Sequence, residues 1–486
     1  MTESFNFPVR ALEALERNPA AIAFSTLTQA LPNGVVAGYV RAYALHLAKR
    51  KVGRGSVVMI GLPNGMTDFF AAFATNLLGA IWIGSHEDIP LDAVKVTHLL
   101  YDRTNPVRLS HPGVHEVDDS WLTPPAGFVV DQQGLFVGFS SGDDVAYIAR
   151  SSGTTGRAKF MERTVLQFCE SVANSPVDGY AAIAPLAASI SSMGYRNTLA
   201  GIIAGVPVVK PAPGRDFTGM AGDMARAGVE WVAGSPAQVD ALCRGVEPPD
   251  VRIHMLRVAG SIMTREAVGH WLRFFQRICL NYGARERAGG GDMIVQRIED
   301  MDEVAYTLRP EVTAQIVSDT GEVLPHSTPG IVRLRSPTMV TRYIGNNDAT
   351  AEIFRDGWFY PGDLGLLMAD GRLRILGRAK DQLNLGGVKF NAADVDAAVL
   401  RVPGIVGAMC YPVQMSTGMT ELHLCAIAEP GAAYPQLAAA IRAVLTANRP
   451  IVRLAGIAFV DALPLNESGK PLRSAGARAS DGRMSY

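Results

Sequence analysis

Short apolar runs typical of buried strands alternate with helical segments from residue 37 onward. Residues 37–52 and 69–78 have the apolar spacing of helices, and the runs 56–61 and 80–83 that follow them are strand-like. Parallel strands need a helix-length connection between them. The alternation therefore predicts a parallel, doubly wound sheet.

A second set of strands and helices follows residue 162. The expected strands are 181–186, 206–209, 230–233, 256–259 and 278–281, and the expected helices are 163–173, 193–204 and 266–277. This second set again indicates an α/β arrangement.

The texture changes after residue 306, where short runs separated by turns predict antiparallel β structure. Beyond residue 377 a separate small unit is expected, with strands at 407–413 and 421–428 and a helix at 435–448. The polar tail, residues 474–486, is expected to be loose.

At 486 residues the chain is too long for a single core. The expected fold class is α/β. Residues 1–376 are expected to form a large N-terminal domain of two doubly wound sheets plus a small β-barrel-like subdomain, and residues 377–486 a smaller α+β C-terminal domain.

A loop rich in hydroxyl groups and glycine follows the strand-like run 145–149. It consists of Ser151, Ser152, Gly153, Thr154, Thr155, Gly156, Arg157, Ala158 and Lys159. Glycines permit positive φ angles, so successive backbone N–H groups can face one anion, and the hydroxyls add donors. Lys159 adds a charge, although the spacing is not that of G-x-x-x-x-G-K-[ST]. The loop is expected to bind phosphate, and the alternative is a solvated turn.

Composition limits the partners of the chain. A net charge of −1 provides no long-range attraction to nucleic acid or to an anionic membrane. The five cysteines are scattered without a C-x-x-C pair, which predicts reduced thiols and no zinc site. The N-terminus lacks the pattern of a signal peptide, and the most apolar window, residues 69–83, is too short to span a bilayer. We therefore expect a cytoplasmic protein.

Four further stretches carry unusual chemistry. They are residues 281–286 (NYGARE), 357–363 (GWFYPGD), 377–381 (GRAKD) followed by the glycine pair 386–387, and 463–470 (LPLNESGK). With the loop, and in this order, they resemble the adenylate-forming family of acyl-CoA synthetases, luciferases and stand-alone adenylation enzymes. The family patterns are S-S-G-T-T-G-x-P-K, Y-G-x-T-E, G-W-x-x-T-G-D, G-R-x-K-D with G-G, and L-P-x-x-x-x-G-K. The resemblance covers nearly the whole chain, and the ordered set is specific although each motif alone is weak.

The resemblance implies that ATP, Mg²⁺ and coenzyme A, or a phosphopantetheine carrier, bind to this chain. The residues that it assigns to these cofactors are Ser151, Ser152, Gly153, Thr154, Thr155, Gly156, Lys159, Gly260, Ser261, Asn281, Tyr282, Gly283, Asp363, Arg378 and Gly387. Tyr282 would lie against adenine. Asp363 would bind the ribose hydroxyls with Arg378 nearby, and Gly387 would line the pantetheine channel.

Four residues would carry the chemistry. Glu286 would hold Mg²⁺, and Lys470 would bridge the substrate carboxylate and the α-phosphate. Lys380 occupies the hinge position about which a mobile C-terminal domain would rotate. Arg285 replaces a threonine whose hydroxyl touches the α-phosphate, so it would supply that contact or reach the substrate instead.

Several positions depart from the family pattern. Besides Arg285 they are Ala158, Phe160, Pro361, Ala392 and Asp394. Because the catalytic lysine, the metal carboxylate and the ribose aspartate are kept, we expect a divergent, working enzyme.

The acyl pocket is expected at residues 185–195. Its candidate residues are Ala187, Ala188, Ser189, Ser192, Met193 and Gly260. This segment contains no acidic residue to pair with a buried ammonium group, which argues against α-amino acid substrates. The small side chains suggest room for a bulky aryl, cyclic or acyl carboxylate.

The expected function is an ATP-dependent ligase that joins a small carboxylic acid to a thiol, coenzyme A, through an acyl-adenylate. Two alternatives stay open. The acceptor could be a carrier-protein phosphopantetheine or an amine, or the chain could be a non-catalytic nucleotide-binding relative, as the departures at Arg285 and Phe160 would allow. The sequence identifies neither the acid nor the oligomeric state.

Overall fold

The structure is a computed structural model. It describes residues 5–26, 28–63, 65–85, 89–103, 113–128, 134–151, 158–212, 215–260, 263–286, 290–379, 382–385, 388–415, 420–448, 454–465 and 472–480. The chain divides into two compact units. Unit 1 comprises Met1–Ser151, Ala158–Thr313 and Arg335–Phe359, and unit 2 comprises Ser152–Arg157, Ala314–Leu334 and Tyr360–Tyr486. The domain boundary expected at residue 377 stays a prediction.

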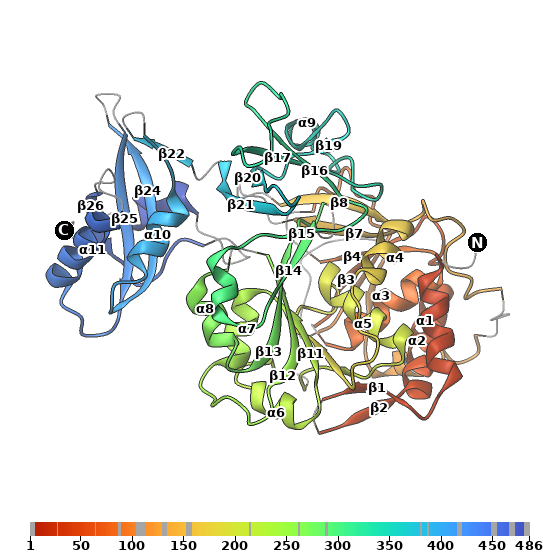
Figure 1. Ribbon diagram of the computed structural model, residues 1–486. Helices are drawn as coiled ribbons and strands as arrows, with labels where there is room; N and C mark the ends of the chain where they lie inside the picture. Colours follow the sequence, from red (N-terminus) through yellow and green to blue (C-terminus); the bar gives the residue numbers. More distant parts are fainter. Residues whose placement is uncertain are drawn as a thin grey trace. The chain divides into compact units, whose positions relative to one another are not determined.

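A six-stranded sheet in unit 1 has the order β6-β5-β3-β4-β7-β8. Figure 1 labels its strands β3, β4, β7 and β8. Its strands are β3 (Val57–Gly61), β4 (Ile81–Gly84), β5 (His98–Tyr101), β6 (Val114–Glu116), β7 (Val145–Ser151) and β8 (Lys159–Thr164). The first five strands in this order are parallel, and β8 is antiparallel to β7, with Ser151 opposite Lys159. The two ends of the hydroxyl-rich loop are therefore held side by side.

A nine-stranded sheet has the order β15-β14-β13-β12-β11-β9-β10-β1-β2. Its strands are β1 (Ile22–Ser25), β2 (Ala30–Pro32), β9 (Ile183–Pro185), β10 (Val208–Val209), β11 (Trp231–Gly234), β12 (Ile253–Ala259), β13 (Phe275–Tyr282), β14 (Gly291–Val295) and β15 (Thr307–Leu308). The strands from β13 to β1 in this order are parallel, and antiparallel strands flank them on both sides. The two sheets confirm the expected α/β class.

Helices connect the strands of unit 1. They are α1 (Phe7–Arg17), α2 (Asn33–Lys49), α3 (Thr67–Leu77), α4 (Val165–Ala173), α5 (Ser192–Ala204), α6 (Ala221–Arg226), α7 (Pro236–Cys243), α8 (Arg265–Trp271) and α9 (Asn347–Ile353), with 3₁₀ turns at Asp119–Leu122 and Ile298–Asp302 and a hairpin of β18 (Phe354–Arg355) and β19 (Trp358–Phe359). The helix expected over 266–277 is too long, because the chain leaves α8 after Trp271 and enters β13 at Phe275. Apolar residues in this stretch fit either period, and pairing with β12 decides for the strand.

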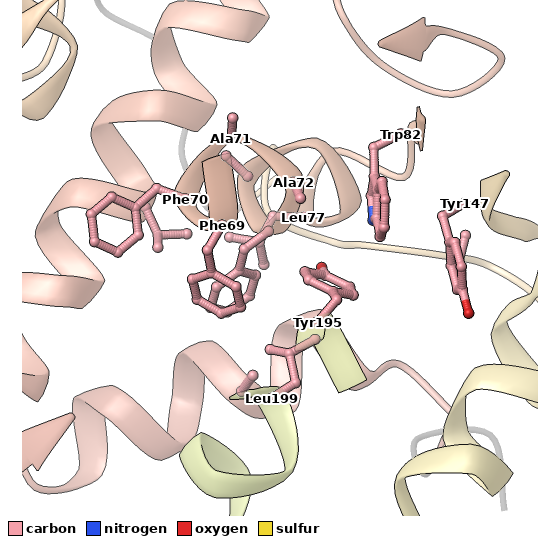
Figure 2. Packing of buried hydrophobic residues seen from close by; sticks show 14 of the residues in the cluster. Phe69, Phe70, Ala71, Ala72, Leu77, Trp82, Tyr147, Tyr195 and Leu199 are labelled. Atoms are coloured by element: carbon pink, nitrogen blue, oxygen red, sulfur yellow. The ribbon is translucent and has the colours of Figure 1, made fainter. Parts of the chain in front are cut away.

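The core of unit 1 fixes helix α5 against α3 and the six-stranded sheet. Figure 2 shows the rings of α3 gathered opposite Tyr195 and Leu199 of α5. The Tyr195 hydroxyl donates to Asn76 Oδ1 at 2.8 Å, and Trp82 Nε1 donates to the same oxygen at 3.2 Å. A buried amide whose oxygen accepts two such bonds holds its partners in one register. The first turn of α5, where the acyl pocket is expected, is thereby positioned.

Unit 2 is built largely from antiparallel strands. Its elements are β16 (Thr313–Val317), β17 (Gly330–Arg335), β20 (Asp363–Leu367), β21 (Leu373–Arg378), β22 (Gln382–Leu385), β23 (Val388–Asn391), α10 (Ala392–Val399), β24 (Ile405–Gln414), β25 (Thr420–Ala428), α11 (Tyr434–Asn448), β26 (Leu454–Phe459), a 3₁₀ turn at Arg473–Ala475 and α12 (Gly476–Ala479). β20 pairs antiparallel with both β17 and β21, as expected for this part of the chain. Helices α10 and α11 share one apolar core with the sheet β24-β25-β26.

The end of the described chain packs on β24. Gly476 lies so close to the ring of Tyr411 that a Cβ atom there would be 2.4 Å from it. Tyr411 also forms a 2.7 Å hydrogen bond with Ser480, and Arg473 pairs with buried Asp396 of α10 at 2.7 Å. The prediction of a loose tail is therefore wrong for residues 474–480, because a glycine and a buried ion pair hold them. In the part of the chain that the structure describes, no helix is long and apolar enough to cross a membrane.

Candidate active site

The segment after β13 stands at the carboxyl end of the parallel strands, the edge where α/β sheets bind ligands. Asn281 donates its side-chain amide to Asp292 at 2.6 Å. Tyr282 is half-buried, with its ring centroid 5.5 Å from that of Tyr306. Both residues predicted to contact the nucleotide thus lie in a polar and aromatic corner of unit 1.

Glu286 is buried and oriented by Tyr343. The Tyr343 hydroxyl donates to Glu286 Oε1 at 2.7 Å, and the backbone N–H of Val340 donates to the Glu286 carbonyl at 3.0 Å. Burial, and then the charge of Glu286, raise the pKa of Tyr343 far above its ordinary value, so the phenol stays a donor. Lys159 Nζ lies over the Tyr343 ring, 5.0 Å from the centroid. Lys159 of the loop and Glu286, the expected metal ligand, therefore both contact Tyr343.

Tyr343 was not among the residues predicted from the sequence. It is 57 residues from Glu286, and no motif in the sequence marks it. Its contact with Glu286 exists only in the folded chain.

Glu286 suits the metal that the resemblance implies. Mg²⁺ is usually bound by one or two carboxylates together with phosphate oxygens of the substrate. Among the described residues, no group of three or more His, Cys, Asp and Glu side chains forms a complete metal site. A single buried carboxylate, held by a phenol on one oxygen, fits an ion that shares its coordination with a nucleotide.

Arg285 points to the end of β7. Its guanidinium donates to the backbone carbonyl of Arg150, and its own carbonyl accepts from Arg163 Nη1 at 3.3 Å. These bonds tie the segment after β13 to β7 and β8, the two strands that flank the hydroxyl-rich loop. Its contact with the α-phosphate or the substrate stays a prediction.

Phe160, one of the departures from the family pattern, points into the core of the six-stranded sheet. It is 2% exposed and packs with Val57, Met59, Ile83 and Ile148. The sheet core accommodates its bulk, so this departure is no argument against nucleotide binding.

Asp363 and Arg378 meet within unit 2, as the resemblance implies. They are paired across β20 and β21, and Arg378 Nε lies 3.0 Å from Asp363 Oδ1. Arg378 also donates to the carbonyl of Pro361 at 2.6 Å, so the residue that replaces threonine contributes through its backbone. The carboxylate is 5% exposed, and the ion pair holds it in one orientation.

The expected acyl-pocket residues gather at the start of α5. Ser191 caps the helix by accepting from Gly194 N at 3.0 Å and donates to the Ala188 carbonyl at 2.7 Å. This folds the segment with Ala187 and Ala188 back onto the first turn, which carries Ser192 and Met193. These four residues are half-buried.

Ser189 differs from its neighbours because it is buried in a polar network. Its hydroxyl donates to the Gly65 carbonyl at 2.6 Å and accepts from Lys210 Nζ at 3.2 Å. Asp68, also fully buried, is the acidic neighbour of Lys210. An acidic group absent from the pocket segment is thus supplied by α3, and Lys210 is the basic group beside it. The assignment of Ser189 to the acyl pocket stays a prediction.

Nine predicted residues lie outside the described part of the chain. They are Ser152, Gly153, Thr154, Thr155, Gly156, Ser261, Lys380, Gly387 and Lys470. Gly260 is described with a φ of 117°, and Gly283 is exposed.

The family model for AMP-binding enzymes matches residues 13–344, more than half of the chain. The chain belongs to the AMP-binding enzyme family. This membership confirms the resemblance that the ordered motifs suggested.

Curated relatives of this AMP-binding enzyme include 3-hydroxybenzoate–CoA ligase of Aromatoleum sp. (strain CIB), 30% identical over 33% of this chain and 31% of the relative. Oxalate–CoA ligase of Arabidopsis thaliana is 26% identical over 68% of this chain and 66% of the relative. The chain thus aligns with about a third to two thirds of the length of these relatives.

Solved structures share the fold over almost the whole chain. O-succinylbenzoate coenzyme A synthetase from Bacillus subtilis, in complex with AMP, matches with a TM-score of 0.83 at 19% identity, covering 98% of this chain and 99% of that one. An amide bond synthetase from Marinactinospora thermotolerans matches with a TM-score of 0.80 at 18% identity, covering 97% and 99%. At these identities the likeness establishes the fold of the AMP-binding enzyme.

Proposed function

We propose that this AMP-binding enzyme is an acid–thiol ligase. In the first half-reaction a carboxylate oxygen of the acid attacks the α-phosphorus of ATP. An acyl–phosphate bond forms, the bond between the α- and β-phosphates breaks, and pyrophosphate leaves. In the second, the thiolate of coenzyme A attacks the acyl carbon, a thioester forms and AMP leaves. Because ATP and coenzyme A are supplied in the cytoplasm, the proposal includes a cytoplasmic location.

The observation that carries the proposal is the grouping of Lys159, Tyr343 and Glu286 on unit 1. A carboxylate and a nucleoside triphosphate repel each other, so adenylation needs positive charge beside the phosphates. Lys159 would supply one such charge, and Tyr343 would hold Glu286 in place to bind Mg²⁺. Bound there, Mg²⁺ would neutralise phosphate charge.

The acceptor is inferred from the relatives and from the motifs. Both curated relatives named above are CoA ligases. Lys470, which the family resemblance assigns to the reacting carboxylate and the α-phosphate, would act in the first half-reaction only. An acyl carrier protein or an amine would be the acceptor if coenzyme A proved inactive.

The test is pyrophosphate exchange into ATP over a library of carboxylates, followed by AMP release with and without coenzyme A. We expect exchange with at least one acid and AMP release that depends on coenzyme A. Lys470→Ala should lower exchange about 10²–10³-fold, the usual effect of losing one donor to a transition state. Lys95→Ala, on an exposed surface of unit 1, serves as the control. Absence of exchange with every acid would refute the proposal, and AMP release indifferent to coenzyme A would point to an amine or carrier-protein acceptor.

A further inference from the structure

Four arginines of unit 1 lie close enough to one another for their charges to interact, and two of them share one carboxylate. They are Arg163 of β8, Arg196 of α5, Arg257 of β12 and Arg309, which follows β15. On the nine-stranded sheet, Arg257 is paired with Cys279, and Asn281 two residues on is paired with Asp292. Residues two apart in a strand share a face, so these side chains lie on one side of the sheet.

The carboxylate of Asp292 is shared between two of the arginines. Arg257 Nη2 lies 2.9 Å from Asp292 Oδ1, and Arg309 Nη2 lies 3.2 Å from Oδ2. Within the described ranges, these are the ion pairs that the four guanidinium groups make. Arg163 donates instead to the backbone carbonyl of Arg285 at 3.3 Å.

Arg196 likewise donates only to neutral acceptors among the described residues. Its Nε donates to Asn197 Oδ1 at 3.1 Å, and its Nη1 donates to Ser171 Oγ at 3.2 Å. Burial, followed by the charges of Arg257, Arg309 and Arg163, lowers the pKa of Arg196 to about 10. The guanidinium stays charged at neutral pH, and like charges surround it.

The cluster is buried and has unused donors. Arg163 is 2% exposed, and the side chain of Arg309 is 10% exposed. Arg309 Nε and Nη1 and the amide nitrogen of Asn197 are buried without a hydrogen-bond partner among the described residues. Buried cations that exceed their counter-charges are unfavourable, so such a cluster favours the binding of an anion.

The position of Arg196 links the cluster to the expected acyl pocket. On α5 it follows Ser192 by four residues and Met193 by three, and such residues lie on one side of a helix. All three are half-buried, whereas Gly194 and Tyr195 between them are buried. The cluster therefore continues the pocket by one helical turn.

We propose that the four guanidinium groups bind a second anionic group of the acid substrate, so that the enzyme activates one carboxylate of a diacid or of an acid bearing another oxyanion. This inference rests on the proposed ligase function. The reacting carboxylate loses its charge on adenylation, so it is a poor permanent partner for the cluster. A second anion keeps its charge through both half-reactions.

The test compares acids that differ only in the second charge, using pyrophosphate exchange and thermal unfolding. The pairs are succinate with butanoate, glutarate with pentanoate, and isophthalate with 3-methylbenzoate. We expect kcat/KM for at least one diacid to exceed that of its partner by about 10²-fold or more, because a polar site rejects a ligand that leaves its groups unpaired. In that pair, only the diacid should also raise the Tm of the protein when ATP is absent.

Arg196→Met should abolish both the diacid preference and the rise in Tm, whereas Arg226→Met, on the exposed surface of α6, should keep both. Since Arg196→Met removes a half-buried charge that has no ion-pair partner among the described residues, the variant is expected to fold, and its Tm without ligand checks this. Exchange with monoacids but no preference for any diacid would overturn the inference and leave the ligase function standing. An Arg196→Met variant with a raised KM for ATP and an unchanged preference would instead assign the cluster to the nucleotide. Exchange with no acid at all would remove both proposals.

Discussion

Tyr343 shows how much of the site depends on one hydroxyl group. Its hydrogen bond to Glu286 is the contact that fixes one oxygen of a buried carboxylate. The phenol is held protonated because burial and the neighbouring charge raise its pKa. The carboxylate oxygen that it leaves available then has a defined direction for a metal ion.

Tyr343→Phe is expected to lower kcat/KM for Mg·ATP about 10–100-fold, since a hydrogen bond to a charged group contributes about 1.5–3 kcal/mol. Pyrophosphate exchange at varied Mg·ATP measures it. Tyr101→Phe is the matched control. Tyr101, on β5, also donates its hydroxyl to a glutamate, Glu116 of β6 at 3.4 Å, and it is not among the site residues. Equal values of kcat/KM for Mg·ATP in the two variants would show that the hydrogen bond from Tyr343 to Glu286 does not contribute to the use of Mg·ATP.

Asp68 makes stability depend on pH. Burial raises its pKa from 3.8 to about 7, against the opposing charge of Lys210. Between about pH 4 and 7 the folded protein therefore holds a proton that the unfolded chain has released, and the free energy of unfolding falls as pH rises. Lys210, whose pKa burial lowers to about 8, acts in the opposite direction above pH 8.

Asp68→Asn should remove this fall, which amounts to at most about 1.4 kcal/mol per pH unit. Denaturant unfolding at pH 5, 6 and 7 compares the variant with the wild type and with Asp178→Asn, an exposed aspartate. An unchanged slope in Asp68→Asn would mean that the carboxyl ionises normally in the folded protein.

At the scale of elements, α5 is the helix that the pocket depends on. Its first turn carries Gly194, and a Cβ atom there would stand 2.0 Å from the carbonyl oxygen of Ala188. Backbone atoms make this contact, so the pocket segment and the helix could not both keep their places. The glycine allows the segment to fold back onto the helix.

Gly194→Ala is expected to destabilise the protein by about 1–3 kcal/mol and to raise KM for the acid. Gly38→Ala in α2 is the control, because nothing lies within 4 Å of its added Cβ and alanine favours a helix. That variant should gain about 0.5–1 kcal/mol. Thermal unfolding and exchange kinetics measure both variants, and a neutral Gly194→Ala would show that the segment can move.

At the scale of the whole molecule, the proposed mechanism needs two half-reactions served by one chain. We propose that residues 377–486 rotate about Lys380 between them, as the family resemblance implies. Rotation at a hinge requires its backbone dihedrals to change. Proline fixes φ at about −65°.

Lys380→Pro should therefore impair one half-reaction far more than the other. Pyrophosphate exchange reports adenylation, and thioester formation from a synthetic acyl-adenylate reports the second step. Lys380→Ala leaves the backbone dihedrals free. In that variant, the half-reaction that Lys380→Pro impairs more should therefore keep a higher rate than it does in Lys380→Pro. Equal loss of both half-reactions in the proline variant would argue against a hinge at this residue.

The sequence by itself determined the order of elements and the family. Period-2 and period-3.6 spacing are local properties, so they identified most strands and helices of both sheets. The same local signals failed over 266–277, where strand pairing decided, and in the tail, where Gly476 packs on Tyr411. The family resemblance implied that Arg378 lies near Asp363, and the structure pairs the two side chains. Their contact with ribose stays a prediction.

Only the tertiary structure decided which distant side chains meet. Glu286 meets Tyr343 across 57 residues. Arg257 reaches Asp292, which Arg309 also contacts, because β12, β13 and β14 pair in one register. Hydrogen bonds and charges act over a few ångströms, whereas a sequence pattern records only neighbours along the chain. The excess of buried positive charge beside α5 was therefore invisible until the sheet and the helix had been placed together.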